Sequence, residues 1–249
     1  MVNTFSNSTA YGKRAKLGLI VPPTNTVNEA EWHAMMPADV TLHVTRMPLH
    51  TDVLSKKGKE GLYRDIEKST TDLGMAGLTS IAYGCTAGSM ADPINQLTDF
   101  MTKISGIPCV STADSILAAL NYLEVKKISV ATPYHQDLNN HEMLFLENNG
   151  FDVLSISGLG IGSGGPHEYI QIAQTPIDKI KSHILSVNCD AADALLISCT
   201  DFPSLHLIPE IEQEIGKPVI SSNQSTLWRA LRASGIEDFL MDYGKLFKT

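Results

Sequence analysis

The sequence contains no long apolar run, and no run of Lys or Arg stands out. KKGK (56–59) sits in a polar stretch, and we interpret it as the solvated start of a helix. Its 249 residues include 19 Lys and Arg against 27 Asp and Glu, which gives a net charge of −8. An acidic chain is a poor match for nucleic acid or an anionic membrane surface, and no stretch approaches the ~20 apolar residues that span a bilayer. The polar N-terminus lacks the apolar segment of a secretory signal. We therefore expect a cytoplasmic protein without nucleic-acid or membrane partners, with a loosely ordered tail over residues 1–14.

Cysteine is scarce, and common cofactor motifs are missing. The four cysteines, at positions 85, 109, 189 and 199, have neither CxxC nor zinc-ligand spacing, so we expect reduced thiols and no metal. Neither GxGxxG nor GxxxxGK[ST] occurs, and we expect no organic cofactor. The glycine-rich stretch GLGIGSGGPH (158–167) does not match a dinucleotide fingerprint. We interpret it as a flexible loop near the functional site that acts as a lid.

What the chain does contain is an internal repeat. Two apolar runs, LTSIAYGCTAG and ADALLISCTDF, both end in Cys-Thr, and Cys85 and Cys199 are 114 positions apart (199 − 85). KLGLIVPPTN and KISVATPYHQ are offset by 111 positions (127 − 16), and GIPCVSTADSILAAL and GKPVISSNQSTLWRAL by 110 (216 − 106). Three landmarks in one order at nearly one spacing predict a duplicated unit.

Apolar and amphipathic segments alternate between these landmarks. The apolar runs lie at 16–21, 40–46, 78–84, 107–110, 127–132, 152–156, 193–198 and 217–220. Amphipathic segments such as 60–77 and 169–187 separate them. Continuously apolar strands that alternate with helices predict parallel sheets covered on both faces. We expect an α/β fold of two lobes, residues 15–120 and 121–249, each with a four-stranded parallel sheet, and a last helix that crosses back to the first lobe.

Polar and nucleophilic residues follow corresponding strands of the two sets. Asn25 and Tyr134 follow the first strand of each set, and Cys85 and Cys199 follow the third. In open parallel sheets, ligands bind beyond the carboxyl ends of the strands. If a pseudo-twofold axis relates the lobes, these residues converge on one cleft that takes one small molecule.

A cysteine at a strand end is usually a small packing residue, and we interpret Cys109 and Cys189 in this way. Cys85 and Cys199 differ because they occupy equivalent repeat positions and precede small or polar residues. A helix N-terminus at these points would direct N–H groups into the cleft, hold a carboxylate and lower the thiol pKa. Two thiols that face one carbon can exchange a proton across it, or combine thiolate addition with proton transfer.

Five stretches resemble the aspartate/glutamate racemase superfamily, and within it the branch of maleate cis–trans isomerases and arylmalonate decarboxylases. They are GLIVPPTNTVNEAEW, AYGCTAGSM, SVATPYHQDLN, LLISCTDFPS and PVISSNQSTLWRALR. The resemblance covers nearly all of the chain after residue 15 and implies a two-lobed flavodoxin-like fold. It implies that Cys85 and Cys199 form the catalytic pair. It also implies that a carboxylate substrate is bound by Asn25, Tyr134 and the backbone N–H groups at Thr86, Ala87 and Thr200.

The presence of both cysteines favours isomerisation or racemisation, because decarboxylases of the arylmalonate kind keep only the second. In a maleate-type isomerase, Cys85 would attack the alkene as a thiolate and Cys199 would transfer the proton. In a racemase, the two thiols would exchange acid and base roles at one Cα.

The stretch GSGGPHEY lacks the Asn with which maleate isomerases contact substrate, so a larger dicarboxylate or a 2-substituted acid stays open as the substrate. A malonate-type decarboxylase is the third alternative among enzymes, and a ligand-binding protein without catalysis is the alternative outside enzymes. We also expect a homodimer or higher homo-oligomer.

The remaining polar candidates have a simpler interpretation. We interpret Arg46 as a surface residue at a strand end, although it could supply a cation to the cleft. Asp201 is interpreted as the N-cap of a helix that begins at Pro203. Three histidines in predicted cleft loops are interpreted as solvated or structural: His50, His135 and His167.

Overall fold

The computed structural model describes residues 9–53, 55–91 and 93–248. It contains two four-stranded sheets in which every strand pair is parallel. The first comprises β1 (Ala15–Val21), β2 (Val40–Arg46), β3 (Ser80–Tyr83) and β4 (Cys109–Ser111) in the order β2-β1-β3-β4. The second comprises β5 (Lys127–Tyr134), β6 (Asp152–Ile161), β7 (Ala194–Ile197) and β8 (Val219–Ser221) in the order β6-β5-β7-β8. The two orders correspond strand for strand, and the predicted α/β fold class is confirmed.

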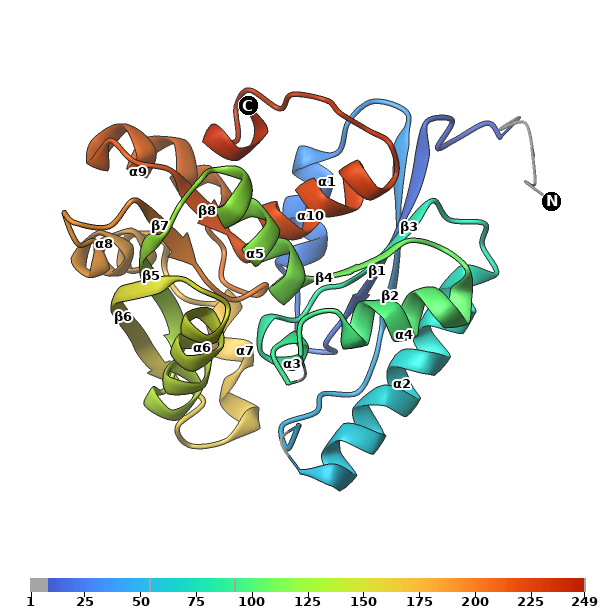
Figure 1. The fold of residues 1–249 in the computed structure, drawn as a ribbon, viewed down its shortest axis with the longest axis horizontal. Coiled ribbons are helices and arrows are strands. Elements are labelled where there is room, and N and C mark those ends of the chain that lie inside the picture. The colour runs from blue at the N-terminus through green and yellow to red at the C-terminus, as the bar shows by residue number, and fades with distance from the viewer. Residues whose placement is uncertain (1–8, 54, 92, 249) are drawn as a thin grey trace.

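Helices connect the strands and lie around both sheets (Figure 1). The helices of the first half are α1 (Asn28–Met35), α2 (Lys56–Gly74), α3 (Thr86–Ser89), α4 (Gln96–Ser105) and α5 (Thr112–Tyr122). Those of the second half are α6 (Gln136–Asn148), α7 (Ile170–Ala173), α8 (Ile177–Val187), α9 (Ile208–Ile215) and α10 (Ser222–Ala233). Short 3₁₀ helices span Pro166–Glu168, Leu205–Leu207 and Lys245–Phe247. The amphipathic segment expected over 169–187 is divided into α7 and α8, because Pro176 precedes α8 and cannot donate a helical hydrogen bond.

The repeat is also visible in how helices end and begin. Helices α4 and α9 both end at a glycine in the left-handed region, Gly106 with φ 68° and Gly216 with φ 72°, where a side chain would be strained. Five residues later the hydroxyls of Ser111 and Ser221 cap α5 and α10. The matched sequences GIPCVS and GKPVIS therefore encode one local structure twice.

Helices α5 and α10 run side by side between the two sheets (Figure 1). Helix α10 packs against β3 and β4 of the first sheet, and the Ser80 hydroxyl donates to the carbonyl oxygen of Ala230 at 3.0 Å. The larger hydrophobic cluster contains strand residues from both sheets, such as Leu19 and Leu196. The division into lobes at residues 120 and 121 stays a proposal.

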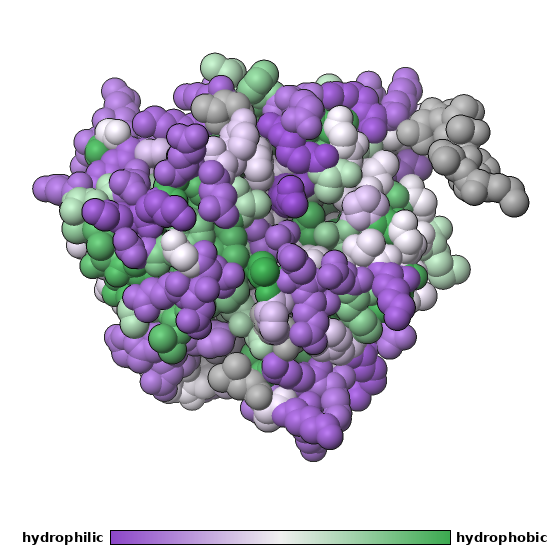
Figure 2. Space-filling view, viewed as in Figure 1, coloured by the Kyte–Doolittle hydropathy of each residue, from purple (hydrophilic) through white to green (hydrophobic). Residues whose placement is uncertain are grey.

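The face in Figure 2 is mainly hydrophilic, with hydrophobic residues visible in smaller patches between the charged and polar ones. Within the described ranges, no helix is both long and apolar enough to cross a bilayer. Most of the tail predicted over residues 1–14 falls on positions 1–8, which lie outside the described residues. At its described end, Arg14 forms an ion pair with Asp238.

Candidate active site

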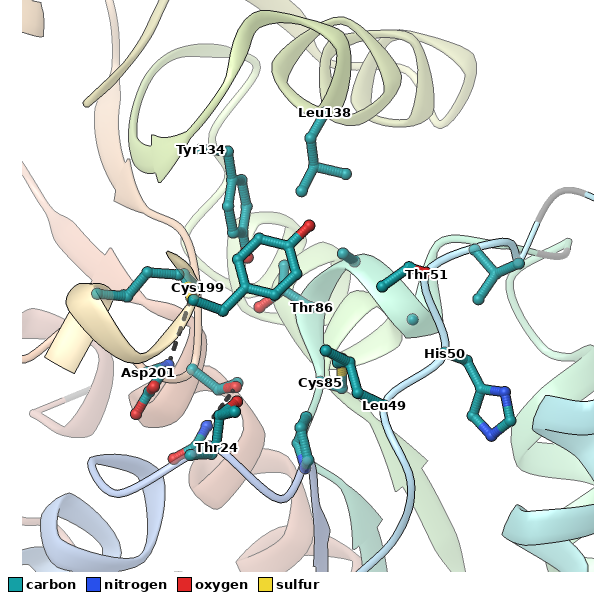
Figure 3. Close-up of a pocket in the computed structure, with 18 of the residues that line it drawn as sticks. Thr24, Leu49, His50, Thr51, Cys85, Thr86, Tyr134, Leu138, Cys199 and Asp201 are labelled. Carbon is teal, nitrogen blue, oxygen red and sulfur yellow. Dashed lines mark hydrogen bonds between the residues drawn. The ribbon is translucent and has the colours of Figure 1, made fainter. Parts of the chain in front are cut away.

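A cavity of about 280 Å³ lies between the two sheets, at the carboxyl ends of their strands. Every residue that the sequence analysis selected for the site lines it: Asn25, Cys85, Thr86, Ala87, Tyr134, Cys199 and Thr200. Figure 3 shows the two cysteines in the wall of this pocket, and each follows a strand of a different sheet. The structure therefore brings the predicted residues together, whereas Cys109 and Cys189 are not among the lining residues.

Cys85 joins β3 to α3. It stands at the N-cap of this four-residue helix in an extended conformation, with φ −144° and ψ 112°, and is partly buried. The Tyr83 hydroxyl and the Gly88 N–H form hydrogen bonds with the thiol. A Cβ added at Gly88 would overlap the Tyr83 hydroxyl and lie 3.1 Å from Cys85 Sγ. Glycine is therefore needed at position 88 for the tyrosine to reach the sulfur.

Cys199 stands two residues beyond β7 on an unusual backbone. Its φ is 104°, a conformation that costs a non-glycine residue of order 1–3 kcal/mol. The residue is 8% exposed. The Asp201 N–H donates to Sγ at 3.4 Å, and the Tyr134 hydroxyl forms a hydrogen bond with the same thiol. The Cys199 N–H donates to Ser222 Oγ at 3.0 Å, which ties the strained peptide to the start of α10.

Burial raises the pKa of both thiols. For Cys85, burial outweighs the hydrogen bonds from Gly88 and Tyr83, which lower the pKa. For Cys199, burial and the neighbouring Asp201 carboxylate raise the pKa far above its usual range, against the hydrogen bonds from Tyr134 and Asp201 N–H. The expectation of lowered thiol pKa values was wrong, because loss of solvation dominates the contribution of hydrogen-bond donors in this pocket. No α-helix follows Cys199 directly, and the next, α9, begins at Ile208.

Threonine and serine hydroxyls hold the two cysteine loops together. Thr86 Oγ1 donates to Ser222 Oγ at 3.0 Å, and this serine also accepts the Cys199 N–H. Thr200 Oγ1 donates at 3.1 Å to the carbonyl oxygen of Gly84, which precedes Cys85. Each Cys-Thr ending is thus bonded to the other half of the molecule. As the first residues of α3, Thr86 and Ala87 have N–H groups that helix geometry leaves without an internal acceptor.

Asn25 is buried and held in one orientation. Its Oδ1 accepts the N–H groups of Val27 at 3.1 Å and Asn28 at 2.9 Å, and its Nδ2 donates to Thr200 Oγ1 at 3.0 Å. An amide nitrogen carries two hydrogens, so Nδ2 has a second one besides the one that it donates to Thr200. Arg46 is not a lining residue; its Nη2 donates to the Asn25 carbonyl oxygen at 3.1 Å. It supports the Asn25 loop from outside and brings no cation into the cleft.

Asp201 has a role that differs from the predicted one. No helix begins at Pro203, so the helix-cap prediction was wrong. Asp201 Oδ1 instead accepts the N–H groups of Thr26 at 2.9 Å and Val27 at 3.2 Å. It therefore joins the Cys199 loop to the Asn25 loop. Burial raises the pKa of this carboxyl to about 6, against the two N–H donors that lower it.

Histidines and the glycine-rich stretch lie around the pocket. His50 and His135 line the cavity, whereas His167 does not; the His50 ring turns toward α2 (Figure 3), where it bonds Asp65 at 2.9 Å. Residues 158–161 are the end of β6, so the prediction of a flexible loop over the whole of 158–167 was wrong. The following turn is held by Glu168, whose Oε2 accepts the N–H groups of Gly162 and Gly164.

The sequence analysis missed the apolar side of the pocket. This side is built from loops and from helices α6 and α7 and includes Pro22, Leu49, Val53, Leu138, Tyr169 and Ile172. Pro22 directly follows a predicted strand and could have been found by that position. The others carry no signal that separates a pocket wall from an ordinary core face. No Lys or Arg is present among the described residues that line the cavity.

These features define an α/β protein in which two parallel sheets of equivalent strand order each contribute a cysteine to one pocket. The family model described as arylmalonate decarboxylase matches residues 17–247, and the chain belongs to this family. The branch predicted from sequence is thereby confirmed.

Individual relatives cover nearly the whole chain. A maleate isomerase from Alcaligenes faecalis is 26% identical, covering 94% of this chain and 96% of its own length. An arylmalonate decarboxylase from Bordetella bronchiseptica is also 26% identical, covering 93% and 95%. The chain shares its fold with a solved structure of a cysteine-to-serine mutant of Nocardia farcinica maleate cis–trans isomerase that carries a covalently bound succinylcysteine intermediate. That comparison has a TM-score of 0.84 at 23% identity and covers 94% of this chain and 98% of the other.

Proposed function

We propose that the chain is a cofactor-independent isomerase that uses Cys85 and Cys199 on a small dicarboxylate or a related carboxylic acid. The observation that carries the proposal is the pair of thiols, one from each sheet, in the wall of one cavity. The maleate isomerases among the relatives support the reaction type.

The donors in the pocket suit a substrate carboxylate. Asn25 Nδ2, the Tyr134 hydroxyl and the N–H groups at the start of α3 are uncharged. Neutral donors can hold a carboxylate and also stabilise the enediolate that forms from it. The apolar side, with Leu49, Leu138 and Ile172, leaves room for a substituent on the acid. A substituent on the acid is therefore compatible with this pocket.

The reaction would begin with Cys85 as a thiolate. A C–S bond forms to one alkene carbon, and the π electrons move to the neighbouring carbon, which takes a proton from the Cys199 thiol. The adduct rotates about its new C–C single bond. Cys199, now a thiolate, removes the proton, the double bond re-forms in the trans arrangement, and the C–S bond breaks to return Cys85 as a thiolate.

The environments of the two thiols support this assignment of roles. The Asp201 carboxylate opposes a thiolate at Cys199, so Cys199 holds its proton at rest and is suited to be the acid. No carboxylate raises the pKa of Cys85, and two donors face its sulfur. It is therefore the better nucleophile of the pair.

Turnover of small acids in D2O, followed by NMR, tests the proposal. The expected result is conversion of a cis to a trans diacid or of its 2-substituted analogue. Cys85→Ser and Cys199→Ser should each lower turnover by about 10²- to 10⁴-fold, and Cys199→Ser should still form an adduct at residue 85 that mass spectrometry detects. Exchange at Cα without isomerisation would instead indicate a racemase, and loss of CO2 a decarboxylase. Binding without any reaction would overturn the enzyme proposal.

Alkylation provides a second test of the same site. Because both thiols have raised pKa values, we expect iodoacetamide to react more slowly with them near neutral pH than with free cysteine. A bound dicarboxylate should slow the reaction further.

We also infer a cytoplasmic location, which the four free thiols fit, and a homo-oligomer, which sedimentation would test.

A further inference from the structure

Two buried glutamates occupy equivalent positions in the repeat. Glu142 on α6 lies 111 positions after Glu31 on α1 (142 − 31), the offset that also relates the starts of the two predicted first strands. Glu31 is 8% exposed and Glu142 is 1% exposed. A buried carboxyl normally needs hydrogen-bond donors, so the two positions allow a direct comparison.

Glu31 has a full set of donors. Its Oε1 accepts the N–H groups of Ser204 at 2.8 Å and Leu205 at 2.9 Å, and its Oε2 accepts Asn223 Nδ2 at 2.7 Å. Three donors from the second half thus hold α1 against it. The carboxyl has a structural function that its contacts explain.

Glu142 has no such set. Among the described residues, no donor lies in hydrogen-bond geometry with either of its carboxyl oxygens, and the hydroxyl of Ser198, directly before Cys199, is also buried without a partner. Burial raises the pKa of Glu142 to about 7, and the nearby Ser198 hydroxyl, although outside hydrogen-bond geometry, offsets the rise in part. On the pocket side, the charge of Glu142 acts on Tyr134, which also faces Cys199 and Cys85.

We propose that Glu142 is a positioning residue that stays protonated behind Tyr134, so that no fixed negative charge opposes an anionic substrate in the pocket. This inference rests on the proposed binding of a carboxylate by that pocket. A substrate carboxylate beside Tyr134 would favour the neutral form of Glu142 further, because two like charges disfavour each other. Binding of the substrate and retention of this proton would therefore be coupled.

Within the described part of the chain, no cation contributes to the pKa of Glu142. Helix α6 packs against β5 and β6. The titratable residues of β5 are Tyr134 and, exposed at the other end, Lys127; β6 carries only Asp152, which is also exposed. On α6 itself, His141 is the adjacent titratable residue, and it lines the pocket. No charged group contributes to the raised pKa of Glu142.

The coupling has a predictable sign with pH. Below about pH 7 Glu142 is neutral and substrate binds; above it, the carboxylate repels an anionic substrate, so KM rises while kcat changes less. The stability of the fold also depends on the protonation of Glu142. The folded Glu142 carboxyl keeps its proton up to about pH 7, whereas the unfolded one loses it near the usual glutamate value of 4.5, so the free energy of unfolding falls as pH rises through that window.

NMR titration of the ligand-free protein, with 13C-labelled glutamate carboxyls, tests the first half of the proposal without any need for activity. Burial raises the pKa of Glu31 as well, so the resonance of Glu142 is identified as the shifted one that disappears in Glu142→Gln, and we expect its midpoint near pH 7. The matched variant Glu31→Gln should retain it. If every glutamate carboxyl titrates in its usual range near pH 4, the proposal is overturned. If Glu142→Gln does not fold, the Glu31→Gln spectrum decides the assignment: a resonance near pH 7 that persists there supports the proposal, and its loss there overturns it.

The pH dependence of KM tests the second half. In the wild type, KM for the diacid that NMR screening identifies should rise about tenfold for each unit above pH 7. Glu142→Gln should remove this rise and Glu31→Gln should keep it. A rise that persists unchanged in Glu142→Gln would overturn the proposal. If the wild type converts no acid at all, the proposed isomerase function fails, whereas the carboxyl titration still decides the state of Glu142.

Discussion

Cys85 and Cys199 end corresponding strands of two sheets, yet their backbones differ. Cys85 is extended, with φ −144°, and begins the short helix α3. Cys199 has φ 104° and begins a turn. A strained conformation persists only where its surroundings hold it. Here the bonds from Cys199 N–H to Ser222 Oγ and from Thr200 Oγ1 to the Gly84 carbonyl hold it in place.

The immediate partners of the two sulfurs are alike in kind but different in origin. Each thiol faces one tyrosine hydroxyl and one backbone N–H: Tyr83 and Gly88 for Cys85, Tyr134 and Asp201 for Cys199. Tyr83 belongs to the strand that leads to its cysteine, whereas Tyr134 ends the neighbouring strand. Only Cys199 has a carboxylate that raises its pKa. The duplicated scaffold therefore supplies two thiol sites, and the few residues at each sulfur make them unequal.

The largest expected effect comes from crowding the Cys85 site alone. Gly88→Ala would place a methyl group against the Tyr83 hydroxyl and 3.1 Å from Cys85 Sγ, and a misplacement of ~1 Å at reacting groups can cost about 10²-fold in rate. We expect kcat/KM to fall by about 10²-fold or more. Gly74→Ala, whose new methyl would lie at ordinary contact distance from Ser105, 3.5 Å from its Cβ and 3.8 Å from its Cα, is the matched control. Unchanged kcat/KM in Gly88→Ala would mean that the Tyr83–Cys85 contact has no part in turnover.

Removing one tyrosine hydroxyl at a time should affect one cysteine and not the other. We expect a smaller effect than from Gly88→Ala. A hydrogen bond to a charged group contributes about 1.5–3 kcal/mol, so each thiolate should lose about tenfold or more in population. Tyr83→Phe should slow alkylation at Cys85 and leave Cys199 unaffected; Tyr134→Phe should do the reverse. Alkylation rates per cysteine, read by mass spectrometry of peptides, provide the measurement. Equal slowing of both cysteines by either variant would show that the sites are not independent.

The fold was predictable because its signals are local. All eight apolar runs became strands, and Lys56, in the polar stretch expected to start a helix, is the first residue of α2. The repeated GIPCVS and GKPVIS segments also became equivalent glycine ends and serine caps. The break at Pro176 was missed because the amphipathic pattern continues on both sides of it.

The site was predictable only as far as the repeat extends. Equivalence of strand ends was sufficient to bring Cys85, Cys199, Asn25 and Tyr134 to one pocket, although which of them touch substrate stays a prediction. Whether the thiol pKa values are raised or lowered depends on burial, and the position of a cysteine at a strand end does not reveal how deeply it is buried. Asp201 bonds with Thr26 and Val27, which lie more than 170 residues away from it in the sequence. No local sequence pattern encodes such a contact.

Asp201→Asn tests the one charge that distinguishes the thiols. The Asn side-chain oxygen can still accept the N–H groups of Thr26 and Val27, so the loops should stay joined. Asp201 ionises above its pKa of about 6 and then raises the pKa of Cys199. In a Cys85→Ser background, we expect Cys199 to be alkylated about threefold to tenfold faster in Asp201→Asn above pH 6. Identical rates from pH 6 to 9 would remove the electrostatic reason for treating Cys199 as the acid.

Where the two halves are alike, they should respond alike. Ser111 Oγ accepts the Asp114 N–H at 3.2 Å, and Ser221 Oγ accepts the Gln224 N–H at 3.1 Å. Loss of a helix N-cap costs about 1 kcal/mol, so Ser111→Ala and Ser221→Ala should each lower the free energy of unfolding in urea by about that amount, with similar m-values. Ser55→Ala, at the cap of α2, is a control outside the repeated segment. If one of the paired caps costs several times more than the other, then duplication has preserved the geometry of these helix starts but not their energetics, and the inequality of the two halves extends beyond the sulfur atoms.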